Sequence, residues 1–260
     1  MYDALGMRFT LRCTDPDLAG HLREILSGLE VADDAGGNAP VDLAPSRREV
    51  GSPDAATLFM GMVNLKAVDA AEGSLLLHAG AVSRPHGGSM ILCGPSGSGK
   101  STLTAVLSSR HAYLTDESVC LDPQSLRITP FRKPLALKPG ALGALPHFRP
   151  RTAIEQRYSR DRCLVPPDRL GGPPPPPQPL VPELTVFPTW SPGGDLRVEE
   201  LSTAETAYVL GISGARLESV DGGPLPALAR LARRAPAYRL EFDDPWQAAS
   251  VLDDLWDQAS

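Results

Sequence analysis

The segment from Met90 to Leu103 constrains this chain most, because it joins an apolar run, a glycine-rich loop and an apolar-spaced continuation. Residues Gly94 to Ser101 fit the pattern G-x-x-x-x-G-K-[ST], the P-loop motif. Residues 90–93 predict a buried strand that enters the loop, and residues 102–107 have the apolar spacing of a helix that leaves it. Strand, loop and helix in this order predict an α/β protein that binds a nucleotide through its phosphates.

The residue types in the loop suit an anionic ligand. The glycines permit positive φ and close approach of the backbone, and the loop amides point at an anion at the positive end of the following helix. Lys100 is expected to contact the β- and γ-phosphates of ATP, and the Ser101 hydroxyl to ligate Mg²⁺. The predicted nucleotide-binding residues are Gly94, Pro95, Ser96, Gly97, Ser98, Gly99, Lys100, Ser101 and Thr102. The alternative is a glycine-rich turn that happens to carry a lysine, and the loop alone does not say what receives the phosphate.

Length and charge bound the remaining possibilities. The 260 residues suffice for one sizeable α/β core, or for a core with a small appended unit. A net charge of −6 argues against nucleic acid as the main partner. The four cysteines are far apart and form no C-x-x-C pair, which predicts free thiols in a reducing cytoplasm. Neither a secretory signal pattern nor an apolar run of membrane-spanning length is evident, so we expect a cytoplasmic protein without a membrane partner.

The N-terminal part carries structural patterns and no catalytic signal. Residues 7–13 alternate like a strand, and Asp15 followed by Pro16 predicts the start of a helix. A second helix is expected over about residues 53–71, and its predicted buried stripe consists of Leu58, Met62, Leu65 and Val68. We therefore expect residues 1–72 to form a β-α-α lead-in packed on a catalytic domain of residues 73–260.

A histidine and two acids accompany the loop. Residues 75–82 and 90–93 predict a hairpin that feeds the loop, and this hairpin carries His78 sixteen residues before Gly94. A lone histidine in an apolar strand is more often a hydrogen-bonded core residue than a catalyst. Asp116 and Glu117 lie at a predicted strand after the loop's helix, where a nucleotide site needs acids for magnesium and for activating a nucleophile. The alternative for the two acids is a surface turn with solvated carboxylates.

The later part of the chain contains an Arg- and Pro-rich segment, residues 147–182, which we expect to be mobile. Its arginines are consistent either with a solvated loop or with a clamp for substrate or phosphate. Beyond it, strands are expected over 184–187, 197–201 and 238–242, and helices over 203–210, 224–234 and 245–258. The residues expected to face inward in the last helix are Trp246, Val251, Leu252 and Leu255.

The order of these motifs resembles the catalytic domain of HPr kinase/phosphorylase. It resembles more closely the HPr-kinase-like proteins of peptide natural-product pathways, including lasso-peptide precursor kinases. The matching pieces are residues 77–79, 94–101, 114–117 and 134–138. The resemblance implies an α/β fold with a P-loop kinase core of the HPr kinase/PEP carboxykinase-like type, a mixed sheet and flanking helices.

The resemblance also implies roles for single residues. Asp116 takes the position of the catalytic aspartate that removes the proton from a substrate serine hydroxyl, and His78 that of the histidine beside the reacting serine. Lys100 completes the catalytic set. Asp116, Glu117 and Ser101 are the implied metal ligands, although Glu117 replaces the family's usual aspartate. The arginine- and asparagine-containing stretch of HPr kinases is not found, so phosphorylase activity and HPr as a substrate are not expected.

The implied function is that of an ATP- and Mg²⁺-dependent kinase. Its acceptor would be a serine, or another hydroxyl, of a peptide or protein such as a ribosomal natural-product precursor. Arg132 and Lys138 are implied contacts to phosphate or substrate. Two alternatives remain open: a kinase of a free amino acid or small metabolite, and a nucleotide-binding switch that transfers nothing.

Overall fold

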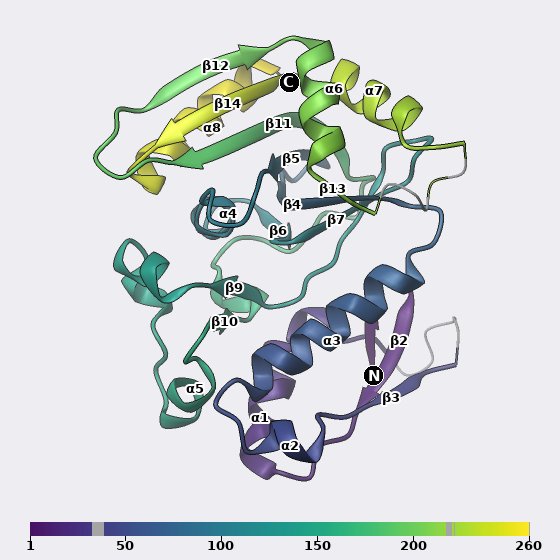
Figure 1. Ribbon diagram of the computed structural model, residues 1–260, viewed down its shortest axis with the longest axis vertical. Coiled ribbons are helices and arrows are strands. Elements are labelled where there is room, and N and C mark those ends of the chain that lie inside the picture. Colours follow the sequence, from purple (N-terminus) through teal and green to yellow (C-terminus); the bar gives the residue numbers. More distant parts are fainter. Residues whose placement is uncertain (33–38, 217–219, 221, 260) are drawn as a thin grey trace. The chain divides into compact units, whose positions relative to one another are not determined.

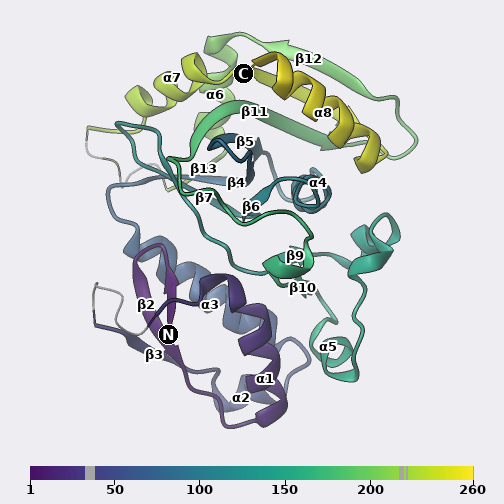
Figure 2. The same ribbon diagram turned by 180° about the vertical axis from the view of Figure 1, so that it is seen from behind.

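The computed structural model describes residues 1–32, 39–216, 220 and 222–259 (Figures 1 and 2). The chain divides into two compact units. The first contains residues 1–71 and 132–170, and the second contains residues 72–131 and 171–260. Residues 132–170 thus group with the N-terminal residues, although they were expected within a domain of residues 73–260.

The first unit contains two small sheets and several helices. Its strands are β1 (Tyr2–Ala4), β2 (Met7–Leu11), β3 (Val41–Leu43), β9 (Leu135–Leu137) and β10 (Cys163–Val165). Its α-helices are α1 (Pro16–Ile25), α2 (Arg47–Val50), α3 (Ala55–Ala70) and α5 (Ala153–Tyr158). Short 3₁₀ turns are η1 (Ser27–Leu29), η2 (Pro139–Gly143), η3 (Pro146–Phe148) and η4 (Pro167–Arg169). One sheet has the order β1-β2-β3, and β9 pairs with β10 in the other.

The sequence predicts the start of α1 correctly but does not predict which face of α3 is buried. Asp15 caps α1, because its carboxylate accepts a hydrogen bond of 2.9 Å from the Leu18 amide, as predicted. The buried stripe predicted for α3 is wrong, since Leu58 is 47% exposed and Leu65 is 67% exposed. The helix instead buries residues that include Phe59 and Val63. Because α3 is apolar on most sides, its hydrophobic periodicity does not select one face.

The second unit is built on a large mixed sheet. Its strands are β4 (Leu75–Ser83), β5 (Gly88–Cys93), β6 (Ala112–Thr115), β7 (Ser118–Leu121), β8 (Ile128–Thr129), β11 (Val181–Trp190), β12 (Arg197–Leu201), β13 (Gly214–Arg216) and β14 (Ala237–Phe242). Its helices are α4 (Lys100–Leu107), α6 (Thr203–Ile212), α7 (Leu225–Arg234) and α8 (Pro245–Ala259). The strand order is β12-β14-β11-β5-β4-β7-β8, and β6 and β13 also pair with β4. Strand β11 runs parallel to β5 and β14, whereas β4 is antiparallel to β5, so the predicted α/β class with a mixed sheet and flanking helices is confirmed.

Strand β4 divides its side chains between two faces of the sheet. Leu75, Leu77 and Ala79 belong to a buried cluster that includes Leu228 of α7. Successive side chains of a strand point to opposite faces, so residues 78 and 80 face the other way. On that face Gly80 lies against α4: a Cβ atom at Gly80 would be 2.2 Å from Thr104 Oγ1. His78 therefore faces the side of the sheet that carries the loop's helix.

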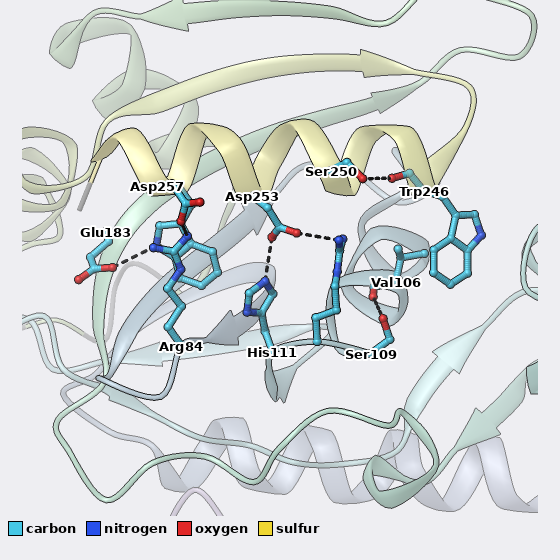
Figure 3. Close-up of polar contacts among 11 residues, drawn as sticks. Arg84, Val106, Ser109, His111, Glu183, Trp246, Ser250, Asp253 and Asp257 are labelled. Carbon is cyan, nitrogen blue, oxygen red and sulfur yellow. Dashed lines mark hydrogen bonds and ion pairs between the residues drawn. The ribbon is translucent and has the colours of Figure 1, made fainter.

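The terminal helix α8 is tied to the sheet and to the end of α4 by polar contacts (Figure 3). Asp253 pairs with Arg110 at 2.9 Å and with His111 at 2.8 Å. Trp256 is fully buried, and its indole nitrogen donates a hydrogen bond of 3.0 Å to Glu183. Helix α8 also packs directly against α4. These contacts fix one side of the helix that follows the glycine-rich loop.

Of the residues expected to face inward in α8, Leu252 is buried, whereas Trp246 is 43% exposed and was predicted wrongly. All four cysteines are free thiols, as predicted. In the part of the chain that the structure describes, no helix combines the length and the apolar character needed to cross a bilayer.

Candidate functional site

The glycine-rich loop, residues 94–99, connects the end of β5 to the start of α4. Gly99 is the N-cap of α4 and has a φ of +93°, a left-handed conformation that side chains other than glycine rarely adopt. A Cβ atom at Gly99 would also lie 2.5 Å from Cζ of Phe242. Conformation and space therefore both require glycine at this position. Pro95, Ser96 and Gly97 are exposed, so the outer part of the loop is accessible.

The loop is held from the side by the end of β11. The amide of Trp190 donates a hydrogen bond of 3.0 Å to the carbonyl oxygen of Ser98. The sequence predicted a strand over residues 184–187 only, whereas β11 reaches Trp190. This longer strand is what brings a parallel neighbour of β5 to the loop, and no signal in the sequence marked that contact.

Lys100 turns back onto its own loop. Its side chain is buried, and Nζ donates hydrogen bonds of 2.6 Å to the Gly94 carbonyl and 2.9 Å to the Pro95 carbonyl. The ammonium thus lies within the loop. If a phosphate binds there, the ammonium can donate its hydrogen bonds to phosphate oxygens in place of the two carbonyl oxygens. Cys93, the last residue of β5 before the loop, is fully buried. Burial raises the pKa of its thiol to about 12, and the Lys100 charge offsets this only in part. Cys93 is therefore a neutral core residue.

Strand β4 brings the loop and the acidic pair together. Ala79 pairs with Cys93, the residue directly before the loop, on one side. On its other side the Ala79 amide donates a hydrogen bond of 3.1 Å to the Glu117 carbonyl. His78 is adjacent to Ala79 and pairs with Ser118 in β7. A single short stretch of β4 therefore lies between the loop and the acidic pair.

The two acids occupy the interruption between β6 and β7. There β4 changes partner from β7 to β6, and Thr115 accepts hydrogen bonds of 3.4 Å from the amides of Glu117 and Ser118. Asp116 is buried, and the phenol of Tyr113 donates a hydrogen bond of 3.3 Å to its Oδ1. Sequence reasoning did not identify Tyr113, because three residues of separation do not place two side chains together in a regular strand.

The pKa of the His78 imidazole is affected by Lys100, Asp116 and Glu117. Burial lowers its pKa most, and the Lys100 charge lowers it further. The charges of Glu117 and Asp116 raise the pKa, as does a hydrogen bond with the Glu117 backbone. The structure therefore gathers His78, Lys100, Asp116 and Glu117, with a net effect that favours the neutral imidazole.

The other predicted residues are placed as follows. Ser101 and Thr102 are half-buried in the first turn of α4. Arg132 and Lys138 belong to the first compact unit, whereas the loop belongs to the second, and their contact with phosphate or substrate stays a prediction. Among the residues that the structure describes, no group of three or more His, Cys, Asp or Glu side chains could hold a metal ion.

No family model fits this sequence, and no curated protein is similar enough to count as a relative.

Proposed function

We propose that this protein is an ATP- and Mg²⁺-dependent kinase with a P-loop core of the HPr kinase-like type. Its acceptor is a serine, or another hydroxyl, of a peptide or protein, and the preferred acceptor is a ribosomal natural-product precursor such as a lasso-peptide precursor. The proposal places the protein in the cytoplasm.

The observation that carries the proposal is the pairing around Ala79. Cys93 before the loop and the Glu117 carbonyl flank this one residue, so the glycine-rich loop and the acidic pair lie on the two sides of one strand, β4. Phosphoryl transfer needs a positive cradle for the phosphates and a carboxylate that receives the proton of the acceptor hydroxyl. The gathering of Lys100, Asp116 and His78 supports both parts.

The residues take the following roles. The loop amides and Lys100 bind the phosphates and stabilise the charge on the transferred group. Asp116 orients the acceptor hydroxyl and accepts its proton. The hydroxyl oxygen forms a bond to the transferred phosphorus while the bond between that phosphorus and the leaving ADP breaks. His78 stays neutral beside Asp116 and can donate or accept a hydrogen bond to the acceptor. Such chemistry depends mainly on positioning and electrostatics.

The donor set fits a magnesium nucleotide, because hydroxyl and carboxylate oxygens are the ligands that Mg²⁺ prefers. Ser101, Asp116 and Glu117 would hold the ion, with the nucleotide phosphates supplying further oxygens. When bound, Mg²⁺ neutralises charge on the phosphates during transfer.

The test is intact-mass analysis of serine-containing precursor peptides after incubation with the protein, ATP and Mg²⁺. We expect a gain of one phosphoryl group, which Lys100→Ala and Asp116→Asn abolish. Asp116→Asn should leave nucleotide affinity largely intact, because Lys100 and the loop amides still bind the phosphates and Ser101 and Glu117 still provide oxygen ligands for the ion. Full activity of Asp116→Asn would remove this residue from the mechanism.

Two other outcomes would replace the proposal. Phosphorylation of a free amino acid or metabolite, with no peptide modified, would indicate a small-molecule kinase. Nucleotide binding with no phosphorylated product at all would indicate a switch.

A further inference from the structure

The first compact unit carries a surface rich in arginine that the proposed chemistry does not use. Between residues 147 and 162 the chain has five arginines and two acids, although its overall charge is −6. Arg149, Arg151, Arg157 and Arg160 are exposed, and these four residues are called the basic surface below. With five arginines and two acids, the segment has a net charge of +3 in a chain whose net charge is −6.

One of the two acids in this segment is directed inward. Glu155 is 8% exposed, and its Oε1 pairs with Arg169 at 3.2 Å. Its Oε2 accepts a hydrogen bond of 2.6 Å from the Arg151 amide. Because both oxygens of Glu155 are engaged internally, this carboxylate does not neutralise the arginines outside. Asp161, which lies 3.7 Å from Arg162, is the remaining acid of the segment.

The segment has an ordered framework beneath its charges. Thr152 caps α5 by accepting a hydrogen bond of 3.1 Å from the Glu155 amide. Tyr158 is buried, and its ring stacks on His21 with centroids 5.7 Å apart. The thiol of Cys163 donates a hydrogen bond of 3.1 Å to the carbonyl of Phe148, which is also buried. Aromatic side chains therefore anchor the segment, and arginines face outward.

We propose that the basic surface binds an acidic segment of the peptide that accepts the phosphoryl group. The guanidinium fork matches carboxylates in geometry and charge. Proteins that bind single-stranded nucleic acid also expose aromatic rings for stacking, whereas the rings of Phe148 and Tyr158 in this segment are buried. The acidic remainder of the chain further repels a long polyanion. The inference rests on the proposed function only in identifying the bound peptide as the acceptor.

Two double variants of the full chain separate this surface from general charge attraction. Arg149→Gln/Arg160→Gln removes two positive charges from the basic surface. Arg48→Gln/Lys66→Gln removes two exposed positive charges elsewhere in the same unit and is the matched control. Circular dichroism melting verifies that each variant folds.

Binding is measured by fluorescence anisotropy with a short labelled Glu-Ala peptide that contains no hydroxyl residue. We expect the first variant to raise the Kd by about three- to tenfold and the control to leave it unchanged, given the modest contribution of each exposed ion pair. Binding should weaken with added salt, since exposed charges are screened. Equal weakening in both variants would overturn the proposal, as would tighter arginine-dependent binding of a single-stranded oligonucleotide.

A kinase assay then tests the identity of the peptide. Acceptor peptides with an acidic or an uncharged flanking segment are compared, and Arg149→Gln/Arg160→Gln should raise KM for the acidic acceptor alone, with kcat unchanged. Transfer with the same KM for both acceptors would refute the inference and leave the kinase proposal standing. Arginine-dependent binding of the acidic peptide without transfer to any peptide would refute the kinase proposal and, with it, the identification of the acceptor.

Discussion

Replacing Gly80 by alanine tests the packing of β4 against the helix that begins at the glycine-rich loop. An added Cβ would lie 2.2 Å from Thr104 Oγ1 and 3.4 Å from Thr104 Cβ. The backbone at Gly80 is not in the left-handed region, so the penalty arises from contact alone. Because Thr104 is buried in α4, relieving the contact requires its side chain, the helix or the strand to shift within a packed core.

The expected cost follows from overpacking a well-packed core, which is about 1–3 kcal/mol. For a chain of this size each kcal/mol lowers the Tm by about 2–4 °C, so Gly80→Ala should lower it by roughly 2–12 °C. Since Lys100 begins the same helix, the shift should also weaken nucleotide binding. Calorimetry or circular dichroism measures the first effect, and titration with ATP measures the second.

A second substitution should rescue the first. Thr104→Ala removes the clashing hydroxyl, which has no hydrogen-bond partner among the described residues, and leaves the Cβ at the tolerable 3.4 Å. We therefore expect Gly80→Ala to cost much less in the Thr104→Ala background. Gly61→Ala is the control, because a Cβ there meets nothing within 4 Å. The same loss of Tm for Gly80→Ala in both backgrounds would refute the packing argument.

Three further predictions concern the candidate site. Tyr113→Phe removes the hydrogen bond to Asp116, which is worth about 0.5–1.5 kcal/mol. In steady-state assays kcat should therefore fall about two- to tenfold, with KM for ATP unchanged. An unchanged kcat would show that the phenol does not position the carboxylate. Gly99→Ala combines a left-handed φ with a contact of 2.5 Å to Phe242, so calorimetric titration should show lost nucleotide binding, and retained affinity would contradict this. Burial and the Lys100 charge lower the pKa of His78 in the folded protein below its ordinary value of 6.5. The neutral imidazole therefore contributes fully to folding stability above pH 6.5. This contribution is lost as the pH falls from 6.5 through the folded-state pKa. Melting curves over this range should show a smaller loss for His78→Gln than for the unmodified chain, and identical losses would exclude His78 as a cause.

Local interactions explain the parts of the fold that were predicted well. The capping box of Ser202 and Glu205 starts α6 at the next residue, and residues 197–201 form β12 as expected. Residues 75–83 and 88–93 form the predicted antiparallel hairpin. In each case the determining groups lie within a few residues of one another, so the sequence pattern contains the necessary information.

The residues of the candidate site were predicted from the sequence, but the hydrogen bonds that hold them in place were not. The glycine-rich loop and the two acids could be identified by residue type and spacing, whereas the histidine was singled out by the family resemblance. The Trp190 amide on Ser98 and the Tyr113 phenol on Asp116 could not, because the first joins distant strands and the second depends on an interruption between β6 and β7. The predicted roles of Arg132 and Lys138 rest on the family resemblance alone.

The loop between β5 and α4, the helix caps and most strand positions could be predicted from sequence patterns, since these features follow from backbone preferences and neighbouring side chains. Tertiary structure decided which face of α3 is buried, how far β11 extends, and that residues 132–170 group with the N-terminal residues. It also decided that Ala79 lies between the loop and the acidic pair. The reason is physical: an apolar segment can bury any of several faces or partners at similar local cost, and only the packing of the whole unit selects among them.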